Sequence, residues 1–423
     1  MKPPKHWWRP IESACFLVPE CVYDDTSLVF KAYFSHQTGP HEMNVYLDNA
    51  ATTPMTQEVV DAMIPFMRDH FGNPSSTHQF GRRTKTAIEQ ARRRIAGHLN
   101  VHPRTICFTS GGTEADNMAL HAGVEQLGCQ RILTCATEHS AVLKTAEHLG
   151  KRDGVSFGLL ALDATGKVDL PELTRTLSDG IPTLVSVMHG NNEVGILQDI
   201  EAIGQVCHEH GALFHTDTVQ TMGHYPLDLG ALPVDFAACS AHKLHGPKGT
   251  GFLYVKDGLK IGAQIMGGSQ ERAMRGGTEN LIGIIGFAAA FDHSMAHLDD
   301  HAAHIRGLKA EMVEGLRAAV PGVRFNAGSD GEESLYTVLS VNFPEHEKNG
   351  MMLFLLDLDG VACSGGSACS SGSTQPSHVL SALGLHEEGR TSIRFSFSRL
   401  TTSKCIQHAL KTVAKIRSAA VLV

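Results

Sequence analysis

The sequence predicts an α/β protein, in which a mostly parallel sheet with helices on both faces precedes a smaller α+β C-terminal domain. Two observations carry this prediction. From Thr105 to Ala238, short apolar runs that suit buried strands alternate with longer stretches that suit helices, a rhythm typical of parallel sheets. A long helical region from about Leu281 then leads into a part of the chain with fewer strands, which indicates a second, smaller core.

Three segments are expected along the chain. With 423 residues it is long enough for two domains. We expect a large domain over residues 43–300 and a small domain over residues 301–423. Residues 1–42 differ from both, because they hold both tryptophans, Trp7 and Trp8, without a clear periodicity. A leader or a misassigned start is the favoured interpretation of this extension, and a docking arm is the alternative.

The individual elements follow from apolar periodicity and from Gly, Pro, Asn and Ser punctuation. Strands are expected at 105–108, 131–134, 155–160, 183–187, 213–215, 234–238, 251–255, 336–343 and 392–397. Helices are expected at 57–70, from about 80 to 99, in the long region 281–319, at 351–358 and at 402–419.

Composition excludes several classes of protein. A hydrophobic content of 42% and a charged content of 19% are typical of a soluble globular protein, and a net charge of -8 gives no reason to expect nucleic-acid binding. One basic run suits the solvated face of a helix better than a binding patch. It comprises Arg82, Arg83, Lys85, Arg92, Arg93 and Arg94.

The cysteines and the apolar runs bear on the compartment. Ten cysteines without a repeated short spacing indicate neither a disulfide framework nor a zinc site, so we expect no metal and a reducing, cytoplasmic environment. No apolar run reaches the roughly 18 residues of a membrane span, so we expect no membrane association.

Lys243 is the first candidate for chemistry. It lies in Ser240-Ala241-His242-Lys243, directly after the strand-like run Val234 to Ala238. A lysine held at a strand end can lose its proton by desolvation and form a Schiff base, as lysines do with pyridoxal phosphate. A solvated surface lysine is the alternative for this stretch taken alone.

Two further strand ends carry groups that suit the same cofactor. Gly112 and Thr113 stand between a predicted strand and a predicted helix, where backbone amides can approach a phosphate, although such turns also occur without one. Asp217 follows the apolar Leu213-Phe214, and a buried carboxylate needs a cation such as a protonated pyridine nitrogen. A helix cap is the alternative for Asp217.

His139 and the turn 188–195 follow two other predicted strands. The His139 imidazole could stack on a pyridine ring and relay protons near neutral pH, but the chain has 25 histidines and a single one is a weak signal. The polar turn contains Asn191-Asn192-Glu193, whose amides could bond a ring hydroxyl.

The predicted small domain contributes a cysteine and an arginine. Cys369 lies in a Gly- and Ser-rich stretch, residues 363–373, that cannot pack a core and is expected to be a mobile loop, from which a thiolate can attack and carry a group elsewhere. Arg394 lies in a strand-like run and suits a bidentate substrate carboxylate, with a structural ion pair as the alternative.

Taken together, these segments resemble the cysteine desulfurases of the NifS and IscS group, pyridoxal-phosphate enzymes of the class V aminotransferase family with the aspartate-aminotransferase fold (fold type I). The resemblance runs from Val45 to the carboxyl end and is specific, because many motifs occur in order. They are Tyr-Leu-Asp-Asn-Ala-Ala-Thr-Thr-Pro, Thr-Ser-Gly-Gly-Thr-Glu, Thr-Glu-His, Asn-Asn-Glu-Val-Gly, His-Thr-Asp-Thr-Val-Gln, Ser-Ala-His-Lys, Arg-Gly-Gly-Thr and Gly-Ser-Ala-Cys.

The resemblance implies a role for each candidate. Lys243 would carry pyridoxal phosphate and shift the substrate's α-proton, and His139 would stack on the ring and help to protonate and deprotonate sulfur or substrate. Asp217 would pair with the pyridine nitrogen, Asn192 and Gln220 would bond the ring hydroxyl, and Thr113, Ser240 and His242 would hold the phosphate. Thr278 would reach the phosphate from the neighbouring subunit, which requires a homodimer.

The implied reaction converts L-cysteine to L-alanine. Arg394 would hold the substrate's carboxylate, and the Cys369 thiolate would take the sulfur as a persulfide and carry it to an acceptor protein. That acceptor would serve iron-sulfur cluster assembly or tRNA thiolation. A selenocysteine lyase, an aminotransferase or another enzyme of this fold is an alternative, and a non-catalytic assembly partner is a second one. Cys363 is outside the motif, and we expect it to end a strand rather than to resolve a persulfide.

Overall fold

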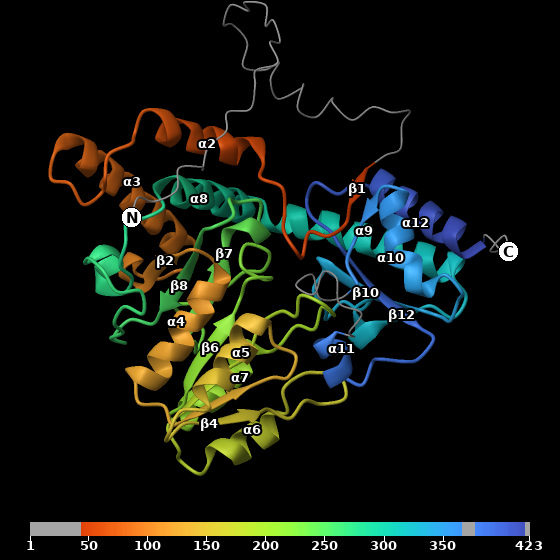
Figure 1. Ribbon diagram of the computed structural model, residues 1–423, viewed down its shortest axis with the longest axis horizontal. Coiled ribbons are helices and arrows are strands. Elements are labelled where there is room, and N and C mark those ends of the chain that lie inside the picture. Colours follow the sequence, from red (N-terminus) through yellow and green to blue (C-terminus); the bar gives the residue numbers. More distant parts are fainter. Residues whose placement is uncertain (1–43, 366–376, 419–423) are drawn as a thin grey trace, which may run out of the picture. The chain divides into compact units, whose positions relative to one another are not determined.

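The computed structural model describes residues 44–365 and 377–418 (Figure 1). The predicted extension 1–42 and Cys369 lie outside the described residues. The predicted division at residue 300 stays a prediction. The hydrophobic residues of the described part form separate clusters, which are described below.

A seven-stranded sheet forms the centre of the fold. Its strand order is β2-β8-β7-β6-β5-β3-β4, and all neighbours are parallel except β8, which is antiparallel to both β2 and β7. The strands are β2 (Ile106–Thr109), β3 (Arg131–Thr134), β4 (Ser156–Leu159), β5 (Thr183–Ser186), β6 (Leu213–Asp217), β7 (Phe236–Ser240) and β8 (Gly251–Val255). The predicted mostly parallel α/β fold is confirmed.

The strands are apolar on both sides, because helices cover both faces of the sheet. In β7, Phe236 and Ala238 belong to one hydrophobic cluster, whereas Ala237 and Cys239 belong to another. The first cluster also contains side chains of α4 (Gly112–Glu125) and α5 (Ser140–Leu149). The second contains side chains of α3 (Gln79–His98), α6 (Leu170–Leu177), α7 (Ile200–Glu209) and α8 (Leu281–Ala296). Alternating side chains thus build two cores from one strand.

Capping side chains define where several of these helices begin. Asp169, Asp199 and Asn280 precede α6, α7 and α8, and each accepts a hydrogen bond from a backbone amide of the first turn. α2 (Gln57–Arg68) packs against α8 beside α3. Short 3-10 turns occur at η1 (Pro103–Thr105), η2 (Ala241–Lys243), η3 (Gln270–Ala273), η4 (Asn326–Gly328) and η5 (Asn349–Met351).

Arg92 corrects the interpretation of the basic run as a solvated face. Five of its six side chains are exposed on α3, but Arg92 is buried, with a side-chain exposure of 2%. Its guanidinium makes two hydrogen bonds with Glu271, at 2.7 and 2.8 Å, and a third with the carbonyl of Ile106. The sequence did not reveal this pairing because Glu271 is 179 residues away.

The predicted helical region 281–319 consists of two helices. α8 ends at Ala296 and α9 (Leu298–Ala319) begins after His297, at a bend of 76°. Within the described ranges, no single helix is long and apolar enough to cross a membrane, and this bent pair meets the criteria of length and composition only when its members are taken together.

A further hydrophobic cluster, separate from the two on the large sheet, surrounds a three-stranded antiparallel sheet of order β12-β10-β9. Its strands are β9 (Arg324–Phe325), β10 (Val338–Phe343) and β12 (Thr391–Ser396), and its helices are α9, α10 (Met352–Leu358) and α12 (Ser403–Ser418). The short helix α11 (His378–Ala382) instead packs in a separate cluster with Val194 and Ile196. The extended entry of the chain joins this part, because β1 (Val45–Tyr46) pairs in parallel with β11 (Val361–Ala362). The first strand of the described chain therefore lies beside residues 361 and 362.

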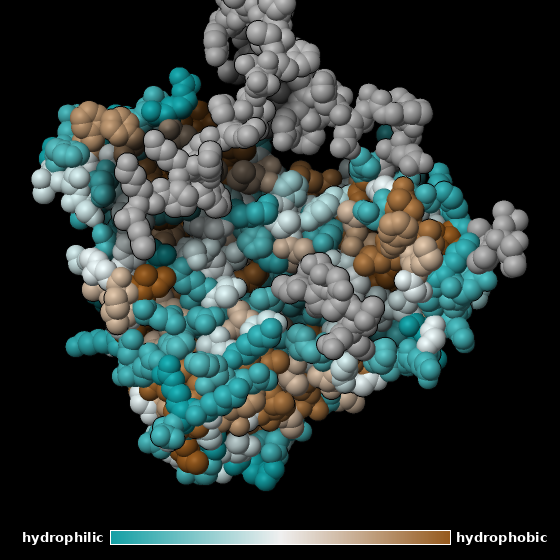
Figure 2. Space-filling model, viewed as in Figure 1, coloured by the Kyte–Doolittle hydropathy of each residue, from teal (hydrophilic) through white to brown (hydrophobic). Residues whose placement is uncertain are grey.

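Exposed apolar side chains gather on α10 and the residue before it. Met351, Leu353, Phe354 and Leu358 are between 40% and 57% exposed, and a brown area lies over this helix in the space-filling view (Figure 2).

Candidate active site

A cavity of about 640 Å³ opens at the carboxyl ends of the parallel strands, where ligands bind in sheets of this kind. Most of the predicted site residues line it. They are Gly112, Thr113, His139, Asn192, Asp217, Gln220, Ser240, His242, Lys243 and Arg394. Strand ends that are far apart in sequence therefore bring these side chains to one place, as the α/β pattern predicted.

The amino end of α4 suits a phosphate group. Gly111 has φ +153°, which residues with a side chain rarely adopt, and a Cβ on Gly112 would lie 2.7 Å from Val219 Cγ2. Glycine at both positions lets the backbone amides of the helix's first turn face the cavity, where their dipoles favour an anion. An adjoining space of about 420 Å³ is lined by the same turn, by Ser240 and His242, and by Lys248.

Asp217 fits a positively charged ring nitrogen. It ends β6, it is 7% exposed, and its Oδ1 accepts a hydrogen bond from the amide of Val219 at 2.8 Å. Burial, together with the nearby Asp116 carboxylate, raises the pKa of Asp217 above its usual value, because the charged form lacks water. A cation against this carboxylate would favour its ionised form, and the protonated nitrogen of the pyridoxal phosphate expected from the sequence is such a cation.

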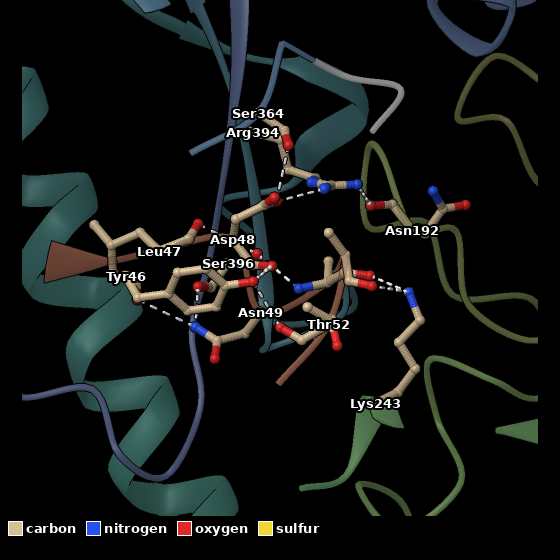
Figure 3. A network of polar contacts seen from close by, with 12 residues as sticks. Tyr46, Leu47, Asp48, Asn49, Thr52, Asn192, Lys243, Ser364, Arg394 and Ser396 are labelled. Atoms are coloured by element: carbon tan, nitrogen blue, oxygen red, sulfur yellow. Dashed lines mark hydrogen bonds and ion pairs between the residues drawn. The ribbon is translucent and has the colours of Figure 1, made fainter. Parts of the chain in front are cut away.

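Lys243 ends the short turn η2, so it stands in one 3-10 turn rather than in an open loop. Its Nζ donates to the backbone carbonyls of Ala50 and Ala51, at 2.9 Å for Ala51 (Figure 3). Gln220 Nε2 donates to the same Ala50 carbonyl at 3.0 Å. The entry segment of the chain therefore meets the amine of Lys243.

His139 has one defined tautomer when it is neutral. It precedes α5, and its Nδ1 accepts a hydrogen bond from the amide of Ala141 at 3.2 Å, so Nε2 carries the proton. Burial lowers the pKa of His139, and Lys243 adds to this effect while Asp217 opposes it. His242, on the phosphate side, has its pKa lowered to about 4 by burial, by Lys243 and by Lys248.

The turn 188–195 is fixed from within. Asn191 Oδ1 accepts hydrogen bonds from the amides of Glu193 and Val194, both at 2.9 Å, and its Nδ2 donates to the carbonyl of Thr137. The buried Glu138 accepts from the amide of Met188, and burial raises the pKa of Glu138 well above its usual value. This rigid turn places Asn192 at the cavity.

Arg394 lies in β12 and reaches the cavity from the second sheet. Its side chain is 1% exposed and forms an ion pair with Asp48 at 2.6 Å, while Nη1 donates to the carbonyl of Asn192 at 2.8 Å (Figure 3). Its Nε is buried and has no hydrogen-bond partner among the described residues. The structural ion pair that the sequence left open as an alternative is present, and the Nε–H group is a donor without an acceptor among the described residues.

Two predicted site residues are not part of this arrangement. Thr278 is exposed and does not line the cavity of the described chain, and Cys369 is outside the described residues. Cys363 follows β11 and is partly buried, and burial raises the pKa of its thiol. The described cysteines are free thiols, and no three His, Cys, Asp or Glu side chains in the described ranges are placed to hold a metal ion.

Sequence reasoning missed several residues around the cavity. His378 lines the cavity, and its Nε2 donates a hydrogen bond to the carbonyl of Glu138 at 2.9 Å. Thr52 contacts His242 through its hydroxyl, at 3.1 Å. Asp48 holds Arg394. Both Asp48 and Thr52 stand inside the quoted motif at 46–54, so the motif marked the segment without assigning its side chains.

A family model described as aminotransferase class-V matches residues 45–408. The chain belongs to this family. A relative from Dictyoglomus turgidum, named cysteine desulfurase IscS, is 42% identical over 377 residues, which cover 88% of this chain and 94% of the relative.

Solved structures agree with this membership. A structure titled NifS-like protein has a TM-score of 0.81 and 35% identity, and the match covers 89% of this chain and all of that one (100%). Another, titled SspA in complex with cysteine, has a TM-score of 0.72 and 32% identity, over 85% of this chain and 100% of the other. Both likenesses extend the resemblance seen in the motifs to the three-dimensional fold.

Proposed function

We infer that this protein is a cysteine desulfurase, which converts L-cysteine to L-alanine and transfers the sulfur. One observation supports this most strongly. A single cavity is lined by Lys243 with its amine, by Asp217 with its buried carboxylate and by Arg394 with its guanidinium. These groups suit a carbonyl cofactor, its ring nitrogen and an amino acid's carboxylate. The names of the relatives agree with this inference.

The cofactor in this proposal is pyridoxal phosphate, which supplies an aldehyde that binds amines and a ring that withdraws electrons. Gly112, Thr113, Ser240 and His242 would hold its phosphate, and Lys243 would carry it. Asp217 would pair with its ring nitrogen, His139 would stack on the ring, and Asn192 and Gln220 would bond its hydroxyl.

The side chains divide the proton transfers between them. Lys243 Nζ takes the proton from the substrate's α-carbon and returns it during formation of alanine. His139 Nε2 carries a proton in the neutral ring, and the lowered pKa of His139 keeps this ring neutral near pH 7. His139 can therefore exchange a proton with the substrate's sulfur without placing a second fixed positive charge beside Lys243.

Cys369 would perform the sulfur transfer. Its thiolate attacks the sulfur of the substrate, a sulfur–sulfur bond forms, and the carbon–sulfur bond breaks with its electron pair passing to the substrate's carbon. That carbon takes up a proton, so one cysteine and one enzyme thiol yield one alanine and one enzyme persulfide. An acceptor protein's thiol then removes the outer sulfur, for iron-sulfur cluster assembly or tRNA thiolation.

The proposal includes a homodimer in the cytoplasm. Thr278 is exposed in the single chain, and it follows a Gly-rich loop that is tied to α4 by the ion pair of Arg275 with Glu114, at 2.9 Å. In the homodimer, Thr278 of each subunit would contact the phosphate that is bound by the other subunit.

The experiment measures alanine released from L-cysteine by the purified protein reconstituted with pyridoxal phosphate. Wild type is expected to turn yellow and release alanine, whereas Cys369→Ala stays yellow and releases none. Lys243→Ala is expected to lose both the retained colour and turnover. Turnover of L-cysteine that survives Cys369→Ala would contradict the proposal, and turnover of L-selenocysteine alone would favour the lyase.

A further inference from the structure

Arg394 has a side that faces the cavity and a side that faces the protein. Its guanidinium lines the cavity, but Asp48, its ion-pair partner, is not among the described residues that line it. In Figure 3, Asp48 and the carbonyl of Asn192 lie on different sides of the guanidinium. Asp48 therefore contacts Arg394 from the side away from the cavity, and the buried Nε of Arg394 has no partner in the described chain.

Burial makes this contact important for the orientation of Arg394. A guanidinium that is 1% exposed has almost no water to balance its charge, and a buried ion without a counterion is strongly unfavourable. Asp48 supplies the carboxylate at 2.6 Å in the described structure. The planar guanidinium group can then point in only a few directions, since two of its nitrogens are already bonded.

Asp48 is itself fixed on a short segment, residues 47–50, that we call the strap. The strap pairs with the end of β12, because Asp48 forms a bridge with Ser396 and the amide of Ala50 donates to Ser396 Oγ at 2.8 Å. The carbonyl of Ala50, at the other end of the strap, accepts from Lys243. The strap thus contacts the amine at 243 through the backbone carbonyl of Ala50, and the guanidinium at 394 through the side chain of Asp48 (Figure 3).

We propose that Asp48 is the positioning residue for Arg394, and that it aims the guanidinium at the carboxylate of an amino-acid substrate. This proposal rests on the proposed function, in which Arg394 binds that carboxylate. Asp48 does not touch the substrate. It acts by fixing the angle and the distance at which Arg394 meets the substrate, relative to the amine of Lys243 at the other end of the strap.

The same carboxylate also contacts the residues that precede the Cys369 segment. Ser364 Oγ donates to Asp48 Oδ1 at 2.9 Å, and the backbone of Ser364 exchanges two hydrogen bonds with that of Arg394, at 2.7 and 3.2 Å. A single oxygen of Asp48 therefore joins the substrate-binding arginine to the chain that leads into residues 366–376. Asp48 positions both from one point.

The test compares two ligands of the holoenzyme, L-alanine and ethylamine, which differ in the carboxylate and share the amine. Binding of each is followed by the change in absorbance of the bound pyridoxal phosphate. The proteins are wild type, Asp48→Ala, Asp48→Asn and the control Asp359→Ala, which removes a carboxylate that pairs with the exposed Lys415. Asp48→Asn keeps an oxygen that can accept hydrogen bonds from Arg394 and Ser364.

Asp48→Ala is expected to weaken L-alanine binding about 10- to 100-fold, the loss typical of a hydrogen bond to a charged group, and to leave ethylamine binding unchanged. Asp48→Asn should fall closer to wild type, and Asp359→Ala should match wild type for both ligands. In an Arg394→Ala background, Asp48→Ala should cause no further loss of L-alanine binding, because the two residues act as a unit.

Three results would overturn the proposal. They are an equal loss for both ligands, which would mark a general structural role, an unchanged or stronger binding of L-alanine by Asp48→Ala, and a full additional loss in the Arg394→Ala background. Failure of the proposed function looks different. The wild type would then release no alanine from L-cysteine, while the comparison of L-alanine with ethylamine would still decide the role of Asp48.

Discussion

The buried pair of Arg92 and Glu271 gives a prediction whose size follows from the structure. Both side chains are 2% exposed, and Glu271 also accepts a hydrogen bond from the amide of Phe108 at 2.8 Å. Removing one partner of a buried ion pair typically costs about 3 to 5 kcal/mol. Glu89 still contacts Arg92 Nε at 3.2 Å, so we place Glu271→Ala at the lower end, about 3 kcal/mol.

The assay is urea unfolding followed by circular dichroism, with the free energy of unfolding taken by linear extrapolation. Asp257→Ala is the matched control, because its pair with Arg104 joins side chains that are 54% and 57% exposed. Such exposed pairs contribute about 0 to 1 kcal/mol. Equal destabilisation by Glu271→Ala and Asp257→Ala would refute the reasoning that burial sets the strength of the Arg92 pair.

Three further predictions concern strain, protonation and the cofactor. Ala273 has φ +63°, so Ala273→Gly is expected to raise the free energy of unfolding by about 1 kcal/mol, and a lower value in urea would contradict this. Burial lowers the pKa of His189 to about 4, so its neutral form favours folding, and this stability is lost as pH falls below the unfolded value of about 6.5. Between about pH 7 and about pH 5, the free energy of unfolding of His189→Gln should therefore fall by about 2 kcal/mol less than that of wild type. Equal falls for the two proteins would contradict this. Gly112→Ala would place a Cβ 2.7 Å from Val219 Cγ2, so the variant should bind pyridoxal phosphate more weakly in an absorbance titration, and unchanged affinity would count against the phosphate site.

The sequence was sufficient for the parallel sheet and for most of the cavity, for a physical reason. Parallel strands end at one edge of their sheet, so polar residues at strand ends or shortly beyond them, such as His139, Asp217 and Lys243, meet there. Local patterns identify both the strands and these residues. The strand at 131–134 and the one at 251–255 have the predicted bounds.

Features that depend on distant contacts were not visible in the sequence. The helical pattern from Leu281 to Ala319 gives no local signal for the bend at His297. The pairing of β1 with β11 joins segments more than 300 residues apart, and the motif that contains Asp48 does not say that this carboxylate meets Arg394, 346 residues later. Burial of Arg92 likewise depends on a partner from a separate loop.

The most direct test of the central claim follows the sulfur atom itself. The holoenzyme is mixed with less than one equivalent of L-cysteine, alanine is quantified, and the peptide that contains Cys369 is analysed by mass spectrometry without reductant. The proposed function predicts one added sulfur atom on Cys369 for each alanine released. Alanine release with no sulfur on Cys369, or with the sulfur on Cys363, would contradict it.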